Sequence, residues 1–225
     1  AVQDESGLYL GLNWNISRAF SLFAYGDYAY FAWPKYGQSF AGAHALDGFL
    51  QLNYQHKKTL LTAQYRTRYR QRDNKEKDML INRNEHRGRI KADYVLGPWQ
   101  LRTQANLTYA LQETGSLGYM LSQSILRHYK CIIVSASLGY FHTQDYSSRV
   151  YTYERGMLYD FSFPCFFGHG IRYSITARSD LGEHLTLLVK TGITDYFDRS
   201  VIGSGLQEIA HSSQTDIQLQ AILKL

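Results

Sequence analysis

The chain has 225 residues, a formal net charge of +5, and an aromatic content of 15% that includes 19 tyrosines and 11 phenylalanines. A length of about 200–250 residues suits one large β domain, and this aromatic content with few prolines favours strands. A mean hydropathy of −0.35, without an apolar run near ~18 residues, excludes membrane-spanning helices. It does not exclude membrane-spanning strands, because only alternate residues of such strands face lipid.

The first six residues lack the basic and apolar regions of a secretory signal. We therefore expect a mature chain, a fragment, or a chain that is not exported. Cys131 and Cys165 fit neither a disulfide framework nor a metal-binding spacing. We expect both to be unpaired packing residues, with a single bridge as the alternative.

Apolar and polar residues alternate with a period of two along nearly the whole chain, which is typical of β-strands. We find no convincing helical segment, so we predict one all-β domain over residues 1–225, with about 12 antiparallel strands. The predicted strands cover residues 8–16, 20–30, 50–55, 59–72, 87–96, 99–109, 117–129, 131–143, 149–160, 171–178, 185–193 and 216–225.

The segment 59–72 has the clearest alternation. Its apolar positions include Leu61 and Tyr65, and the intervening positions carry Arg66, Arg68 and Arg70. A helix would mix these two sets of side chains, whereas a strand separates them onto opposite faces. The segment is also much longer than the usual ~5–6 residues of a strand.

The predicted connections differ in length. Long ones cover about residues 33–46, 73–85 and 197–213, and tight ones follow the first, third, fifth and tenth strands. Long loops at one rim and short turns at the other are typical of outer-membrane barrels. The alternation fails late in the chain, so we expect either a missed strand or an extra crossing between residues 142 and 169.

We predict a transmembrane β-barrel in a bacterial outer membrane, in contact with its lipid and lipopolysaccharide. A closed ring of about 12 strands with apolar residues inside would leave a void, because ~8 strands already match side-chain size. Facing the apolar side chains outward removes that void. Aromatic residues near strand ends would then lie at the membrane interfaces; they include Trp14, Tyr30, Trp99, Tyr109 and Tyr140. A soluble β-sandwich is the alternative.

The same alternation points a set of cations into the lumen. Clustered cations attract anions into a channel, so we predict a channel or translocation component that favours anionic solutes. The alternative is a network with Asp27, Asp93, Glu154 and Asp216 that plugs the barrel, which would then act as a subunit or anchor of a larger outer-membrane complex. The predicted lumen cations are Arg66, Arg68, Arg70, Arg87, Arg89, Lys91, Arg102, Arg172, Arg178 and Lys190.

No catalytic or metal-binding pattern is visible. Gly203-Ser204-Gly205 lacks the spacing of a nucleophile elbow, and the eight histidines are dispersed. We predict no catalytic residue, metal or cofactor, and no enzyme activity; a barrel hydrolase with a site assembled from distant strands is the alternative. There is no specific nucleic-acid motif.

Residues from about 141 to the end of the chain carry several ordered blocks: DYSSRVYTYE at 145–154, FSFP at 161–164 with GHG at 168–170, and DR at 198–199 with IGSGLQEI at 202–209. In these blocks the chain resembles a Bacteroidota outer-membrane β-barrel family, usually with an N-terminal helix-hairpin-helix segment. The resemblance implies a barrel in the outer membrane. That segment is absent, so DNA binding does not carry over, and Leu225 replaces the usual terminal aromatic residue. Family members are longer, so we expect a shortened barrel or part of one.

Overall fold

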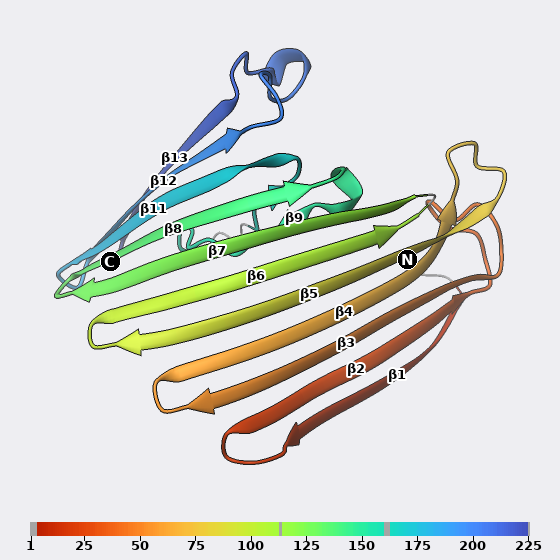
Figure 1. Ribbon diagram of the computed structural model, residues 1–225, viewed down its shortest axis with the longest axis horizontal. Coiled ribbons are helices and arrows are strands. Elements are labelled where there is room, and N and C mark those ends of the chain that lie inside the picture. Colours follow the sequence, from red (N-terminus) through yellow and green to blue (C-terminus); the bar gives the residue numbers. More distant parts are fainter. Residues whose placement is uncertain (1–3, 113, 160–162, 225) are drawn as a thin grey trace.

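The computed structural model describes residues 4–112, 114–159 and 163–224. These residues form one large antiparallel sheet of 11 strands and a second sheet of two short strands (Figure 1). The all-β antiparallel fold is therefore confirmed. The strands of the large sheet, in spatial order, are β1 (Glu5–Asn15), β2 (Phe20–Phe31), β3 (Ala43–His56), β4 (Thr59–Asp73), β5 (Leu80–Leu96), β6 (Trp99–Leu111), β7 (Gly115–Tyr129), β8 (Ile132–Thr143), β11 (His169–Leu181), β12 (Leu185–Tyr196) and β13 (Ser213–Leu223).

The strand register sorts the side chains into two faces. Directly paired residues share a face of a sheet, and the apolar positions pair with one another: Ala24 with Leu50, and Leu50 with Tyr65. The same row of pairs continues through Gly88 to Leu107 on β6. We call this the apolar face, and the opposite one, which carries the arginines of β4, the basic face.

The predicted strand at 149–160 is wrong. Only β9 (Val150–Tyr151) is extended there, and it pairs with β10 (Cys165–Phe166) in the small sheet. Residues 152–157 follow without strand pairing, and Asp160 lies outside the described residues. Since β8 pairs directly with β11, the connection between them crosses the basic face and not the sheet.

Removing that strand restores the alternation of the connections between the two rims. The long connections are 32–42, 74–79, 144–168 and 197–212, and the short turns are 16–19, 57–58, 97–98, 130–131 and 182–184. The three-residue link between β6 and β7 joins these strands at the rim of the long connections (Figure 1). Every long connection is at one rim and every short turn is at the other (Figure 1). Among the described residues between Thr143 and His169, no strand belongs to the large sheet, so the mismatch came from the extra predicted strand and not from a further crossing.

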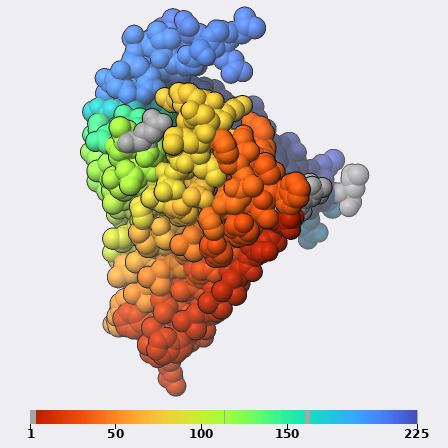
Figure 2. All heavy atoms as spheres, turned by 90° about the vertical axis from the view of Figure 1, so that its right-hand side faces the viewer, coloured from red at the N-terminus to blue at the C-terminus, as the bar shows by residue number. Residues whose placement is uncertain are grey.

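The long 32–42 connection packs against the end of β4. The backbone N–H of Asp73 donates to the Gly37 carbonyl at 3.1 Å, and the Asp73 carboxylate accepts from the Ser39 backbone N–H and hydroxyl, both at 2.7 Å. Figure 2 shows this connection in orange against the yellow β4–β5 loop. These hydrogen bonds fix the 32–42 connection to the end of β4.

The sheet is open across the part of the chain that the structure describes. Strands β1 and β13 lie at its opposite ends (Figure 1), and neither pairs with the other. A closed barrel is thus not observed. Among the described residues, no helix has the length and apolar character needed to cross a membrane.

A small apolar core fixes the β8–β11 connection to the sheet. It consists of Met120, Phe141, Val150 and Phe166, each at most 3% exposed. Gly118 permits the close approach of the 3₁₀ turn η1 (Tyr146–Ser148), because a Cβ at Gly118 would lie 2.1 Å from the Ser148 carbonyl oxygen.

Both cysteines are free. Cys131 is exposed in the turn after β7, so it is not the packing residue we expected, and Cys165 is half-buried in β10.

Candidate functional site on the basic face

The structure places all of the predicted cations on one face of the sheet. Those of β4 and β5 share the face because Arg66 pairs with Arg87 and Gln64 with Arg89. The register extends the face to Arg102 on β6, through its pair with Asp93, and to Arg172 and Arg178 on β11, through their pairs with Gly139 and Ile133. The cations brought together are Arg66, Arg68, Arg70, Arg87, Arg89, Lys91, Arg102, Arg172, Arg178 and Lys190.

Asp47 on β3 neutralises two of these arginines. Arg66 donates to both carboxylate oxygens of Asp47, from Nε at 2.9 Å and from Nη2 at 2.6 Å, and Arg68 Nε donates to Oδ2 at 3.0 Å. Asp47 was not predicted, because the strand was expected to begin at residue 50. The available signal was that Leu46 is in phase with Leu50, which places Asp47 on the opposite face.

Most of the other cations have a partner beside them. Arg87 lies 2.6 Å from Glu85, and Asp93 accepts from Arg102 and lies 3.2 Å from Lys91. Arg178 pairs with Asp180 at the end of β11. Arg89 donates to the side-chain oxygen of Asn106 at 2.8 Å.

The most buried charges form a four-member cluster around Glu154. Arg172 donates to Glu154 at 2.8 and 3.0 Å and to Asp216 at 2.6 Å, and Lys190 lies 3.0 Å from Glu154. The side chains of Glu154, Arg172 and Lys190 are at most 8% exposed. Burial acts to raise the pKa of Glu154, but Arg172 and Lys190 outweigh it, and this pKa lies below its usual value. The carboxylates and cations of this cluster therefore neutralise one another on the basic face.

Two of the predicted compensating carboxylates, Glu154 and Asp216, belong to this cluster, and Asp93 serves the β5–β6 pair of cations. Asp27 forms no ion pair within the described ranges. The predicted network is therefore present in part, and it draws on Asp47, Glu85 and Asp180 as well.

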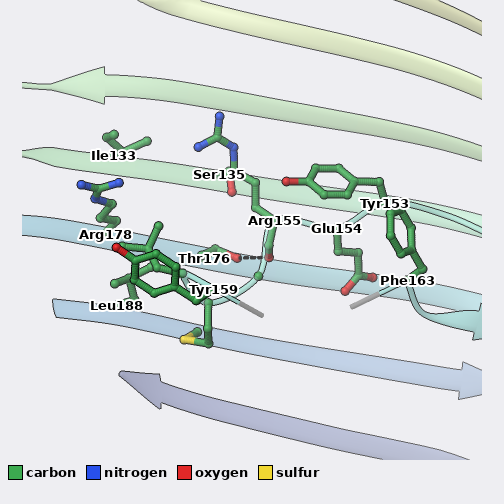
Figure 3. A pocket seen from close by; sticks show the side chains of 13 residues that line it. Ile133, Ser135, Tyr153, Glu154, Arg155, Tyr159, Phe163, Thr176, Arg178 and Leu188 are labelled. Carbon is green, nitrogen blue, oxygen red and sulfur yellow. Dashed lines mark hydrogen bonds between the residues drawn. The ribbon is translucent and has the colours of Figure 1, made fainter. Parts of the chain in front are cut away.

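The unpaired segment after β9 is held against the basic face by its backbone. Thr176 Oγ1 donates to the Arg155 carbonyl at 3.2 Å, as Figure 3 shows. The Gln220 side chain accepts from the Leu158 N–H at 2.8 Å and donates to its carbonyl at 3.0 Å. A cavity of about 260 Å³ remains between this segment and the sheet.

A second cavity, of about 460 Å³, is rich in arginine and lies near the long-loop rim. Its six guanidinium groups come from β4, β5 and the residue after η1, whereas Glu85 is the single carboxylate of its lining. We call it the arginine cavity. Its lining consists of Arg68, Arg70, Arg72, Arg83, Asn84, Glu85, Arg87, Ala110, Gln112, Ser147, Arg149 and Tyr151.

The 3₁₀ turn η1 positions Arg149 at the cavity. Asp145 caps the turn and accepts from the backbone N–H groups of Ser147 and Ser148. A hydrogen bond from the Ser147 hydroxyl, assisted by these backbone bonds, lowers the pKa of Asp145 below its usual value. Arg149 Nε then donates to the Tyr151 hydroxyl at 2.7 Å, and the Arg87 guanidinium lies over the Tyr151 ring at 4.9 Å.

The chemistry available on this face is the binding of anions. Guanidinium groups donate several hydrogen bonds in a fixed planar geometry and do not lose their charge. Within the described ranges, no group of three or more His, Cys, Asp or Glu side chains is arranged to hold a metal ion.

No protein family, curated protein or solved structure matches this chain.

Proposed function

We propose that the protein is an outer-membrane β-barrel that serves as a channel or translocation component for anionic solutes, with the basic face lining its interior. The observation that carries this proposal is the apolar face, which extends across the eleven strands and exposes large apolar side chains. Leu10 on β1 is 67% exposed, Ile90 on β5 65%, and Leu219 on β13 75%. Soluble proteins rarely expose apolar patches larger than a few hundred Å², so the extent of this face supports a hydrocarbon environment.

The strand lengths support the same proposal. The strands of the large sheet contain 11 to 17 residues, and tilted strands of about 9–11 residues span a bilayer. Each strand is therefore long enough to cross and to extend beyond the hydrocarbon.

A band of tyrosine and histidine on the apolar face follows the long-loop rim. Tyr28 is hydrogen-bonded to His44 and Tyr65 to His86, both at 2.7 Å, and Tyr140 lies 2.9 Å from His169. Rings with a polar end concentrate at membrane interfaces. At the opposite rim, Trp99 lies under the Arg127 guanidinium at 4.6 Å. Aromatic side chains with a polar end or a cationic neighbour thus occur toward both rims, which supports the membrane proposal.

The membrane proposal requires that the edges of the sheet be paired. Unpaired backbone N–H and C=O groups are not tolerated in hydrocarbon, so β1 and β13 must be hydrogen-bonded in the bilayer, to each other or to other strands. Hydrogen exchange of the protein in lipid tests this point. We expect slow exchange of the backbone amides of β1 and β13, and fast exchange at either edge would contradict an embedded barrel.

Planar-bilayer recording tests the channel. We expect an anion-selective current that loses selectivity in the triple variant Arg66→Gln, Arg68→Gln, Arg70→Gln. The charge-matched control is Lys57→Gln, Lys58→Gln, Lys75→Gln, which changes exposed residues of turns and loops. The channel proposal is wrong if no current is seen, or if the two triple variants have the same selectivity.

A plugged barrel that anchors a larger complex is the second candidate. The segment around Glu154 favours it, because that segment is held on the basic face by the buried ion cluster and by Gln220. In this case the wild-type protein carries no current, and the variant Glu154→Gln, which weakens the anchoring of the segment, raises the conductance.

A further inference from the structure

We propose that the arginine cavity binds a compact oxyanion with several negative charges, of the phosphate-ester or pyrophosphate class. The proposal deepens the proposed function and rests on it for its biological role, since it names the class of anion and the place where that anion is held.

Two arginines face each other at the cavity, with no counter-charge between them among the described residues. Arg70 on β4 and Arg83 on β5 are directly opposite in the strand register, and both line the cavity. Like charges directly opposite on neighbouring strands repel. In the part of the chain that the structure describes, no ion pair or side-chain hydrogen bond reaches Arg70. An anion bound between these two side chains would remove the repulsion.

A neighbouring pair of opposed arginines does have carboxylate partners. Arg66 and Arg87 are also directly opposite, but Asp47 neutralises Arg66 and Glu85 lies beside Arg87. Carboxylates therefore neutralise Arg66 and Arg87. In the part of the chain that the structure describes, none neutralises Arg70 or Arg83.

Hydrogen bonds to uncharged groups hold three arginines of the cavity. Among the residues that the structure describes, Arg72 and Arg83 donate only to backbone carbonyls, of Tyr36 at 3.1 Å and of Asp73 at 3.5 Å. Arg149 is held by the Tyr151 hydroxyl and the Tyr146 carbonyl. These contacts orient the guanidinium groups without neutralising them, which leaves their charge for a ligand.

The number and spread of the arginines select the ligand class. They come from β4, β5 and the residue after η1, so they approach the cavity from different directions. A single carboxylate offers two oxygens in one plane, whereas a phosphoryl group offers three or more oxygens in a tetrahedral arrangement and accepts from several guanidinium groups at once. The neutral donors of Asn84, Gln112 and Ser147 complete the lining.

Isothermal titration of the full chain in detergent, with inorganic pyrophosphate as the probe and citrate as the comparison, tests the proposal. We expect pyrophosphate to bind more tightly than citrate. The variants Arg70→Gln and Arg83→Gln should each weaken pyrophosphate binding by about tenfold or more, as expected for the loss of a charge-assisted hydrogen bond. The matched control is Arg18→Gln, which removes the same charge at an exposed position in the turn at 16–19.

Three results would overturn the proposal: no pyrophosphate binding, equal binding of citrate, or equal weakening by Arg18→Gln, which would mean that only the overall charge matters. Longer polyphosphate chains that bind tightly when pyrophosphate does not would likewise reject a compact ligand. Because binding is measured without a bilayer, pyrophosphate binding without a current would retire the channel and keep the cavity. A selective current without binding would do the reverse.

Discussion

Arg70 and Arg83 are directly opposite each other on adjacent strands, and no carboxylate separates them. On the same strand as Arg70, Arg66 donates to both carboxylate oxygens of Asp47 on the neighbouring strand β3. The basic face thus combines neutralised and unneutralised arginines within a few residues of one another.

This difference predicts opposite effects of the same substitution. We expect Arg70→Gln to raise the free energy of unfolding by about 0.2–1 kcal/mol in a buffer without multivalent anions, because it removes a like-charge pair. Arg66→Gln should lower it, because Asp47 would lose its bidentate partner. Urea unfolding of both variants measures the two effects. A loss of stability in Arg70→Gln as large as that in Arg66→Gln would show that Arg70 is not electrostatically strained.

The Glu154 cluster predicts a large cost for losing its central carboxylate. In Glu154→Gln, Lys190 would be buried without a counter-charge and Arg172 would keep only Asp216. Breaking a buried pair in this way costs about 3–5 kcal/mol. We expect limited proteolysis to cut the segment 152–159 much faster in this variant. Glu208→Gln, at an exposed glutamate of the β12–β13 connection, is the matched control and should leave the cleavage rate unchanged.

The lowered pKa of Glu154 predicts a pH dependence of the same segment. A carboxyl group whose pKa is lower in the folded state stabilises that state above the pKa of the unfolded state. The stabilisation is lost as the pH falls through the lower, folded-state pKa. We therefore expect the segment to stay protected at neutral pH and to become exposed to an acid-active protease only in acid. Glu154→Gln should abolish this dependence, and an unchanged pH profile in that variant would assign the transition to another group.

The assignment of the two faces predicts which positions tolerate a charge. Ile90 lies on the apolar face and is 65% exposed, whereas Ser122 lies on the basic face opposite Gly139 and Gln104. In lipid vesicles, Ile90→Arg should cost about 2–4 kcal/mol of folding free energy if the position is near the middle of the bilayer. Ser122→Arg should cost much less. Equal costs in a folding titration would reject a lipid-facing role for the apolar face.

Much of this architecture could be predicted from the sequence, because side-chain alternation is a local property. The alternation in 59–72 correctly separates Leu61 and Tyr65 from Arg66, Arg68 and Arg70, and the face of every predicted cation follows in the same way. The start of β3 could not be predicted in this way, since glycines at 42 and 48 interrupt the apolar pattern. Asp47 was therefore left outside the predicted strand.

The error at 149–160 has a different cause. Tyr151 and Tyr153 alternate with Thr152 and Glu154, which has the form of a strand. The Glu154 side chain, however, finds its partners on β11 and β12, and residues 152–157 have no strand pairing. Alternation shows that a segment has two different faces. It does not show whether the segment lies beside a strand or beside a buried ion cluster. For the same reason it does not distinguish an open sheet from a closed barrel.

The alternation of long and short connections makes the two rims unequal as sites for engineering. In the turns at 57–58 and 97–98, one inserted residue would shift the pairing of the adjoining strands by one position, and a shift by one exchanges the apolar and cation-bearing sides of a strand. In the connections at 74–79 and 197–212, extra residues can be absorbed by the loop without altering any strand pair. Epitope tags and fluorescent labels belong at that rim, and sequence drift between relatives should concentrate there.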